Sequence, residues 1–127
     1  TKILGYIKFN EDINGGTHIF GEITGLSVGL HGIHIHEYGD PRDYSTFGNH
    51  YNPHNLRHGD RQDKERHVGD LGNIVFDNLG KCKFSFIDDQ ITVNGKYNIM
   101  GRSVIINKYA DNSAYNEYVA YGIIGYI

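Results

Sequence analysis

The chain has 127 residues, of which 39% are hydrophobic, and it carries a formal net charge of −3. This length is typical of one domain with its own core. The small negative charge does not favour nucleic acid or an acidic membrane surface as a partner, and no apolar run approaches the roughly 20 residues of a membrane-spanning helix.

Cys82 is the only cysteine, so the chain cannot form an intrachain disulfide. The sequence therefore does not need an oxidising compartment. No basic and then apolar signal segment opens the chain. The 17 glycines and 2 prolines indicate many turns rather than a disordered, proline-rich chain.

Seven segments alternate apolar and polar residues with the period of a β-strand. In chain order they are 2–9, 17–24, 32–37, 72–76, 81–88, 101–107 and 118–127. In 81–88, for example, Cys82, Phe84 and Phe86 share one face, as a half-buried strand requires. Turn sequences separate the segments and none has a convincing helical period. This predicts that residues 1–127 form a single all-β domain, an antiparallel sandwich or flattened barrel.

Residues 38–70 interrupt this pattern, because they have no sustained period and are rich in His, Asp, Asn, Arg and Gly. A loop of this length is uncommon in a compact domain unless it has a function. With so few apolar residues we expect the loop not to hold itself by burial. A bound metal would supply the missing cross-link.

Seven of the eight histidines lie between residues 31 and 67. Alternation in 32–37 directs Ile33 and Ile35 to the core, so His34 and His36 project together from the opposite face. The loop adds three imidazoles and a carboxylate, a set that suits a tetrahedral zinc ion: His50, His58, His67 and Asp70. Any one of these histidines alone is better explained as a solvated loop residue, but the pair and the loop set together favour a metal site.

His31 precedes a glycine, and we expect it to be structural, with its ring hydrogen-bonded to the backbone, rather than a ligand.

Several motifs resemble the copper–zinc superoxide dismutases in order and spacing. They include "GLHGIHIHEYGD" (29–40), "GNHYNP" (48–53), "RHVGDLGN" (66–73) and "GRSVII" (101–106), of which "HGIHIHEYGD" and "RHVGDLGN" are the most specific. The resemblance covers essentially the whole chain. It implies the immunoglobulin-like fold of that family, an eight-stranded Greek-key β-barrel.

The resemblance also implies a role for each matching residue. His34 and His36 match copper ligands, and His50 matches an imidazole that bridges copper and zinc. The remaining zinc ligands are matched by His58, His67 and Asp70. Asp111 matches a carboxylate that hydrogen-bonds one histidine of each site and so fixes its orientation, and the structural positions are matched by His31 and Arg102.

The chain departs from the family on the copper side. Asn107 stands where the fourth copper histidine is expected, and alternation with Val104 and Ile106 keeps it on the metal face. An amide oxygen is a weaker copper donor than imidazole. Tyr118 stands where the family has an arginine that docks superoxide, and the preceding loop with its steering charges is reduced to 111–118. Loss of steering and docking lowers association rates by roughly one to three orders of magnitude.

Two further departures concern the scaffold. The family's disulfide positions fall on Tyr121 and near Tyr44, so we expect zinc and tyrosine packing to hold the loop instead. The alignment leaves no room for the family's first strand. We therefore expect a barrel one strand short, with an edge that needs covering.

Because the zinc set is whole and the copper side is altered, the resemblance implies a dismutase-like protein that binds zinc, holds copper weakly and has little or no activity. It would act through metal binding or through a partner: a second copy, a copper chaperone or a cellular dismutase. Inactive homologues of this kind are known among large DNA viruses, so the expected location is the cytoplasm or, for a viral protein, the virion or host cell.

Two alternatives stay open. One is a functional superoxide dismutase that forms oxygen and hydrogen peroxide at a three-histidine copper site. The other is a structural zinc protein whose copper-side histidines are relics.

Overall fold

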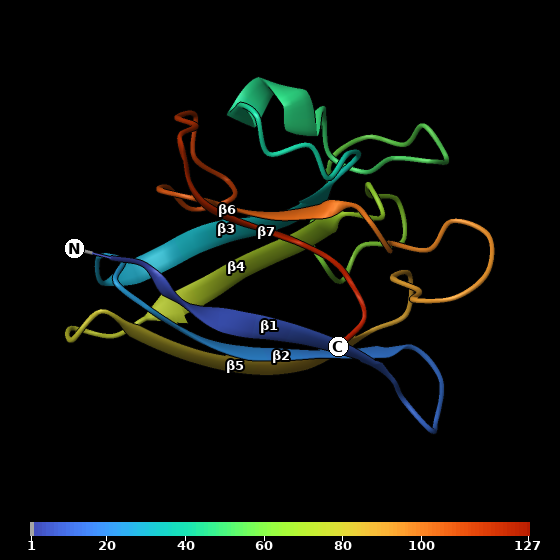
Figure 1. Ribbon diagram of the computed structural model, residues 1–127, viewed down its shortest axis with the longest axis horizontal. Coiled ribbons are helices and arrows are strands. Elements are labelled where there is room, and N and C mark those ends of the chain that lie inside the picture. The colour runs from blue at the N-terminus through green and yellow to red at the C-terminus, as the bar shows by residue number, and fades with distance from the viewer. Residues whose placement is uncertain (1) are drawn as a thin grey trace.

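Two antiparallel β-sheets stack face to face in the computed structural model, which describes residues 2–127 (Figure 1). One sheet has the order β1-β2-β5 and consists of β1 (Leu4–Glu11), β2 (Thr17–Thr24) and β5 (Lys81–Asp88). The other has the order β4-β3-β6-β7, with β4 (Asp70–Phe76), β3 (Gly29–His36), β6 (Ser103–Asn107) and β7 (Tyr118–Ile123). The only helix among the described residues is the short 3-10 helix η1 (Tyr44–Phe47).

All seven predicted strands are present, so the prediction of an all-β fold with antiparallel sheets is confirmed. Residues 17–24 and 81–88 match their predicted bounds, whereas the first strand is displaced by two residues and the last ends at Ile123. Strand β3 begins at Gly29, earlier than predicted, because it pairs with β4 over its first half and with β6 over its second half.

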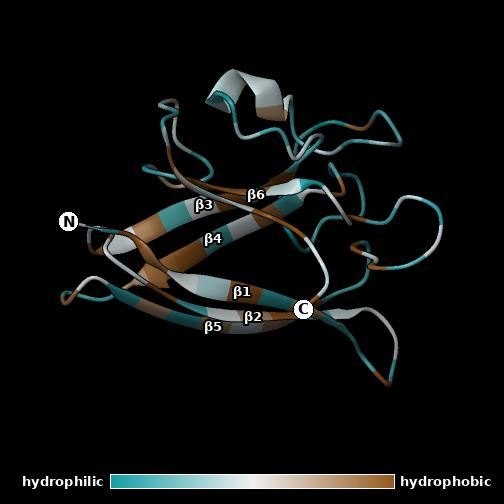
Figure 2. Ribbon diagram, viewed as in Figure 1, coloured by the Kyte–Doolittle hydropathy of each residue, from teal (hydrophilic) through white to brown (hydrophobic). Residues whose placement is uncertain are grey.

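The core lies between the sheets and is built mainly from isoleucines at alternate strand positions. Ile19 and Ile23 come from β2, Ile33 and Ile35 from β3, and Ile106 from β6. Figure 2 shows apolar and polar residues alternating along these strands. Each fully buried side chain of this size contributes roughly 1.5–3 kcal/mol.

Strand pairing stops at β1 on one sheet and at β7 on the other, and each has an edge without a partner strand within residues 2–127. The two sheets are not closed into a barrel along this side. An apolar groove runs there, with Ile7 and Phe9 of β1 on one wall and Ile124 on the other. Among the described residues, no helix is long and apolar enough to span a membrane.

The loop of residues 37–69 covers the outer face of the four-stranded sheet (Figure 1). It is anchored by the buried apolar side chains of Phe47, Tyr51 and Val68. Arg66 is 0% exposed and donates to both carboxylate oxygens of Asp88, at 2.7 and 2.8 Å. The expectation that this loop cannot hold itself by burial is therefore wrong. Its few apolar residues are spaced without a period, which is why the pattern did not reveal them.

Candidate metal centre

Strand β3 and the covering loop supply the imidazoles of the candidate metal centre. Ile33 and Ile35 point into the core, and His34 and His36 lie on the opposite face of β3. Only 4% and 0% of these two histidines are exposed. A β-bridge between His36 and His50 fixes the loop against the strand.

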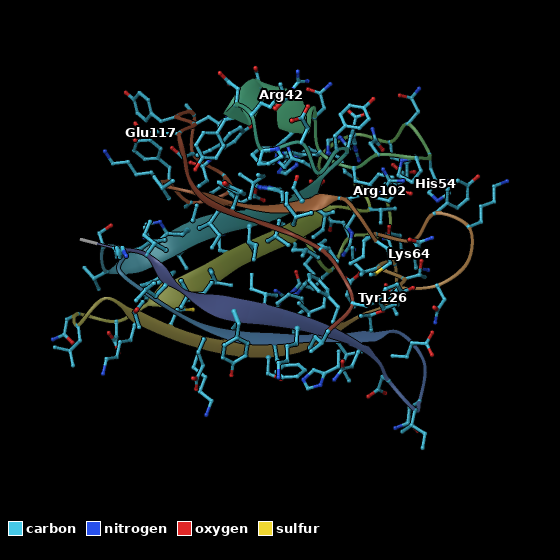
Figure 3. All side chains as sticks on the ribbon, in the orientation of Figure 1. Arg42, His54, Lys64, Arg102, Glu117 and Tyr126 are labelled. Atoms are coloured by element: carbon cyan, nitrogen blue, oxygen red, sulfur yellow. The ribbon has the colours of Figure 1, made fainter. Side chains whose placement is uncertain are left out.

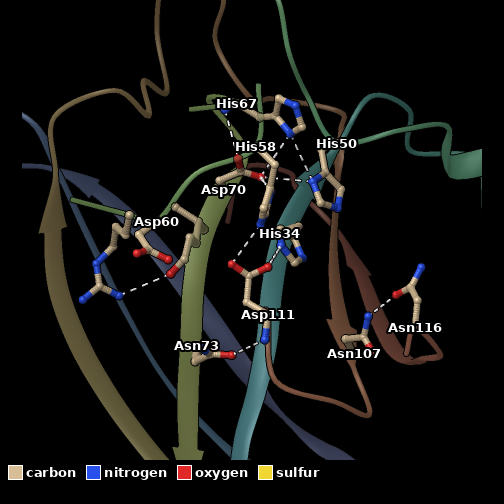
Figure 4. Close-up of polar contacts among 12 residues, drawn as sticks. His34, His50, His58, Asp60, His67, Asp70, Asn73, Asn107, Asp111 and Asn116 are labelled. Atoms are coloured by element: carbon tan, nitrogen blue, oxygen red, sulfur yellow. Dashed lines mark hydrogen bonds and ion pairs between the residues drawn. The ribbon is translucent and has the colours of Figure 1, made fainter. Parts of the chain in front are cut away.

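One group of donors, which we call the loop cluster, converges on a single carboxylate oxygen (Figure 4). It consists of His50, His58, His67 and Asp70. The Nδ1 atoms of the three histidines lie 3.0, 3.0 and 3.2 Å from Oδ1 of Asp70. Nδ1 of His50 is also 3.2 Å from Nδ1 of His67. Ligands of a tetrahedral zinc ion are roughly 3.3 Å apart when the bonds are ~2.0 Å long, so this donor set fits zinc in composition and spacing.

Asp70 is positioned by the backbone around it. Its second oxygen, Oδ2, accepts hydrogen bonds from the N–H groups of Gly59 and His67, both at 3.0 Å. A Cβ atom on Gly69 would lie 2.1 Å from the carbonyl oxygen of Ile35, so only glycine lets the loop run this close to β3.

The charge of Asp70 also suits a metal ligand. Burial alone would raise the pKa of this carboxyl. Hydrogen bonds with His50 and Gly59 and the charges of His58 and His67 outweigh burial and hold the pKa below its usual range. Asp70 is therefore ionised at neutral pH, the form that binds metal.

A second group, which we call the strand cluster, consists of His34, His36 and His50. The rings of His34 and His50 stack with centroids 3.9 Å apart, and the ring of His36 stands edge-on to that of His50 at 5.0 Å. Donor atoms of His34, His50, His58 and Asp70 all lie within 4.8 Å of one another. The strand cluster and the loop cluster therefore adjoin and share His50.

His36 carries the clearest sign of a ligand position in the strand cluster. Its Nδ1 lies 2.9 Å from the carbonyl oxygen of Gly48, while its Nε2 is buried without a hydrogen-bond partner. A buried polar atom of this kind is costly unless something binds it. Burial, helped by the neighbouring His50 and His34, lowers the pKa of His36 to about 4, so the ring is neutral at pH 7.

Asp111 connects the two clusters. Its Oδ1 lies 2.6 Å from Nε2 of His34, and its Oδ2 lies 3.1 Å from Nε2 of His58 (Figure 4). Asn73 of β4 accepts the Asp111 N–H at 2.6 Å. Burial would raise the pKa of Asp111, but the hydrogen bond to His34 and the nearby imidazoles lower it overall. A carboxylate in this place fixes the tautomer and orientation of both rings.

Asn107 does not direct its amide at the imidazoles. Its Nδ2 donates to Oδ1 of Asn116, and its Oδ1 accepts the N–H groups of Tyr109 and Glu117 at 3.1 and 3.0 Å. Figure 4 shows the amide turned toward Asn116. Strand alternation predicted on which face of the sheet Asn107 lies. It did not predict that the side chain hydrogen-bonds to the loop that follows β6.

An open pocket of about 520 Å³ gives access to the two clusters, and its lining contains neither lysine nor arginine. Tyr118 stands edge-on to His36 in this region, with ring centroids 5.3 Å apart. The lining also includes Glu37, whose carboxylate accepts the N–H of Asn49 at 2.8 Å. The approach to the imidazoles is therefore neutral to negative, which does not attract an anion.

Aromatic packing joins η1 to β7 beside this pocket. The ring of Tyr44 contacts those of Tyr118 and Tyr121, with centroids 5.6 and 6.1 Å away. Phe47 contacts Tyr121 at 5.1 Å. Burial raises the pKa of Tyr44. Tyr44 and Tyr121 thus meet where a disulfide is expected in the family.

Of the two residues with an expected structural role, His31 lies in β3 and Arg102 immediately precedes β6. His31 is buried, with Nδ1 2.9 Å from the carbonyl oxygen of Asn107 and Nε2 2.8 Å from that of Ser27. Arg102, labelled in Figure 3, donates to the carbonyl oxygen of Glu37 at 2.7 Å. Its guanidinium group lies 3.8 Å from the ring centre of Tyr51.

Three residues that shape this centre were not predicted from the sequence: Arg66, Asp88 and Asn73. Arg66 precedes the ligand candidate His67, and its partner Asp88 is 22 residues away. Asn73 lies in the quoted motif "RHVGDLGN" but had no role assigned to it. The burial of Arg66 is a property of the folded chain, so the charge that anchors the loop could not be read from the sequence.

Known proteins are similar to this chain in sequence and in fold. Residues 3–124 match the family model for copper/zinc superoxide dismutase (SODC). The chain is 43% identical over 112 residues to superoxide dismutase [Cu-Zn] 3 of Arabidopsis thaliana, covering 87% of this chain and 68% of that protein. It is 44% identical over 112 residues to a superoxide dismutase [Cu-Zn] of Onchocerca volvulus, covering 87% and 71%. The crystal structure of the clock protein EA4 superposes with a TM-score of 0.91 at 39% identity, covering 97% of this chain and 87% of that one.

Proposed function

The chain belongs to the copper/zinc superoxide dismutase family, and on that basis we propose that residues 1–127 form one zinc-holding domain with little or no dismutase activity. One contrast carries this proposal. The loop cluster brings four donors together around a 3.0–3.2 Å spacing, whereas the pocket beside the two clusters, lined by His50 and Tyr118 among others, holds Glu37 and neither lysine nor arginine.

Zinc would be held by the loop cluster: His50, His58, His67 and Asp70. The ion would tie three positions of the loop to the first residue of β4. Its contribution is structural, because all four donors are protein groups and none is left for water or substrate. Asp111 supports this site by orienting His58.

Copper would be held by the strand cluster of His34, His36 and His50, which offers three imidazoles. Copper, when bound, supplies the one-electron redox chemistry by which the family converts superoxide to oxygen and hydrogen peroxide. The protein's part would be to admit the anion and orient it. With Tyr118 and Glu37 at the entrance, this chain lacks the positive charge that attracts and docks an anion.

A functional three-histidine dismutase is the second candidate, and the buried Nε2 of His36 favours it, because that atom is satisfied only when something binds there. On this alternative, copper is retained and superoxide reaches it without electrostatic steering. The expected rate is then lower than in a steered enzyme by roughly one to three orders of magnitude, but it is measurable.

Partner binding is the further part of the proposal. Members of the family are commonly homodimers, and the unpaired edges of β1 and β7 offer backbone groups that another chain can pair with. A second copy, a copper chaperone or a cellular dismutase are the candidates. Light scattering of the pure protein, and of mixtures with each of the other two, separates these three.

The test loads the purified chain with zinc and copper, removes loosely bound metal by dialysis, and measures retained metal and dismutase rate against the Arabidopsis relative. We expect one zinc per chain, little copper retained after dialysis and a rate more than about a thousandfold lower than the relative's. Asp70→Asn is the matched variant and should retain no zinc. Copper retained after dialysis, with a rate within about a thousandfold of the relative's, contradicts the main proposal and supports the second candidate.

A further inference from the structure

The side chain of Asn107 makes three hydrogen bonds, and all of them go to the loop of residues 108–117. Oδ1 accepts the N–H groups of Tyr109 and Glu117, one from each end of the loop, at 3.1 and 3.0 Å. Nδ2 donates to Oδ1 of Asn116. The backbone adds a bond from the N–H of Lys108 to the carbonyl oxygen of Glu117, at 2.7 Å. Asn107 therefore joins the two ends of this loop.

These bonds leave no position for a metal on the amide oxygen. A side-chain amide oxygen has two acceptor lone pairs, and Oδ1 of Asn107 already accepts two N–H groups. The amide nitrogen has no lone pair suited to metal binding. Exposure of the residue is only 8%, so a metal would have to replace hydrogen bonds in a buried setting, which is costly.

The loop that Asn107 closes carries Asp111. Tyr109 is two residues before Asp111, and its carbonyl oxygen accepts the N–H of Gly32 at 2.9 Å. A Cβ atom on Gly32 would lie 3.2 Å from Cα of Asp111, so the loop passes directly over β3 at this point. Whatever holds Tyr109 in place also sets the position of the Asp111 carboxylate.

We propose that Asn107 is a positioning residue that closes the loop of residues 108–117 and thereby places Asp111 between His34 and His58. Copper, where it binds, is held by the three imidazoles of the strand cluster, and the residue at the fourth ligand position acts on both metal sites through Asp111. This inference rests on the proposed function, because it takes the two clusters to be metal sites.

The test measures zinc and copper affinities of Asn107→Ala by competition with chelators, together with hydrogen exchange of the metal-free protein. Loss of the clamp should lower zinc affinity at least about tenfold, the size typical when an outer hydrogen-bond partner of a ligand is lost. Exchange of the Tyr109 and Glu117 amide protons should accelerate by a similar factor. Unchanged zinc affinity with weakened copper binding would overturn the proposal, because that is the result expected of a copper ligand.

Asn98→Ala is the matched control. Asn98 makes the same kind of bonds in another loop: Nδ2 donates to the carbonyl oxygen of Gly95, and Oδ1 accepts the N–H of Met100. Its removal should destabilise that loop and leave both metal affinities within about threefold of wild type. An equal loss of zinc affinity in Asn98→Ala would mean that general destabilisation explains the result, and this would also overturn the proposal.

Asn107→Asp keeps both acceptor bonds and serves if Asn107→Ala does not fold. Its zinc affinity should stay within about threefold of wild type, and the electron paramagnetic resonance spectrum of its Cu²⁺ form should match that of wild type. A shifted spectrum would show that an oxygen of residue 107 reaches copper and would refute the inference. Failure of wild type to bind zinc would instead refute the proposed function, while hydrogen exchange in the metal-free protein still tests the clamp.

Discussion

The loop cluster and the strand cluster are built from the same kind of side chain, share His50, and differ in how they are completed. In the loop cluster, a fourth donor, Asp70, stands at the centre of three imidazoles with Nδ1 atoms 3.0–3.2 Å from its oxygen. In the strand cluster, Tyr118 stands beside His36, and the side-chain polar atoms of Asn107 bond to the loop of residues 108–117 instead. The loop cluster, with four donors, and the strand cluster, with three, are thus neighbours that share the imidazole of His50.

The surroundings of the two clusters differ in the same sense. The loop cluster is supported by contacts that need no metal, above all the buried pair of Arg66 and Asp88 and the close approach of Gly69 to β3. The strand cluster opens on a pocket with no lysine or arginine in its lining. Under the proposed function, the scaffold keeps one metal site in full while the access route to its neighbour lacks the positive charge that attracts an anion.

Of the changes considered, zinc removal should have the largest effect on the stability of the protein. A ligand present at a thousand times its dissociation constant stabilises the folded state by about 4 kcal/mol, which for a domain of this size corresponds to roughly 10–20 °C in melting temperature. A chelator should therefore lower the melting temperature of the zinc-loaded protein by that amount. The Asp70→Asn variant should melt at the temperature of the zinc-free wild type, and the chelator should not change its melting temperature. A melting temperature unaffected by complete zinc removal contradicts the role of the loop cluster.

Asp88→Asn asks whether the loop is anchored independently of zinc. The substitution leaves the guanidinium group of Arg66, 0% exposed, without its charged partner. Breaking a buried pair in this way costs about 3 kcal/mol, so urea denaturation should show this loss with and without zinc. Asp89→Asn, at the exposed neighbouring position, should change stability by less than about 0.5 kcal/mol. A zinc-loaded Asp88→Asn protein of wild-type stability would show that zinc alone anchors the loop.

Tyr118→Arg should move the strand cluster toward anion binding. A guanidinium group beside His36 supplies the charge that the pocket lacks. We expect azide to bind the Cu²⁺-loaded variant about tenfold more tightly than wild type, equivalent to ~1.4 kcal/mol, in an optical titration at low salt. Tyr118→Phe should bind azide as wild type does. Equal affinities in all three proteins would mean that charge at this position does not control anion access.

The contact between Tyr44 and Tyr121 should give the smallest effect. Aromatic pairs contribute about 0.5–1.5 kcal/mol beyond their buried area, so a double-mutant cycle of Tyr44→Ala and Tyr121→Ala should yield a coupling energy in this range. The measurement is thermal unfolding of the metal-free proteins, where zinc cannot mask the contact. Additive losses, with no coupling, would show that the two rings do not tie η1 to β7.

The sequence predicted most of the fold because strand alternation is a local signal. Ile33 and Ile35 alternate with His34 and His36, and this pattern alone places two imidazoles on one face. The anchoring of the loop was not predictable in this way. Phe47, Tyr51 and Val68 follow no period, and Arg66 finds its partner 22 residues further along the chain.

The side-chain direction of Asn107 is a second feature that strand alternation could not predict. Alternation along β6 indicated on which face of the sheet this residue stands. The direction of its amide depends on two N–H groups, of Tyr109 and Glu117, that a turn brings back to the end of the strand. Such a turn is a tertiary feature, and no pattern in residues 101–107 encodes it. The residues of the site were therefore predicted more completely than their hydrogen bonds.

A competition titration of the metal-free protein with zinc and then copper tests the central claim most directly. The account predicts one tight zinc site that Asp70→Asn abolishes. It also predicts a weaker copper site whose Cu²⁺ spectrum shows three nitrogen ligands and does not change in Asn107→Asp. Two sites of equal strength, with a copper spectrum that depends on residue 107, would contradict the account.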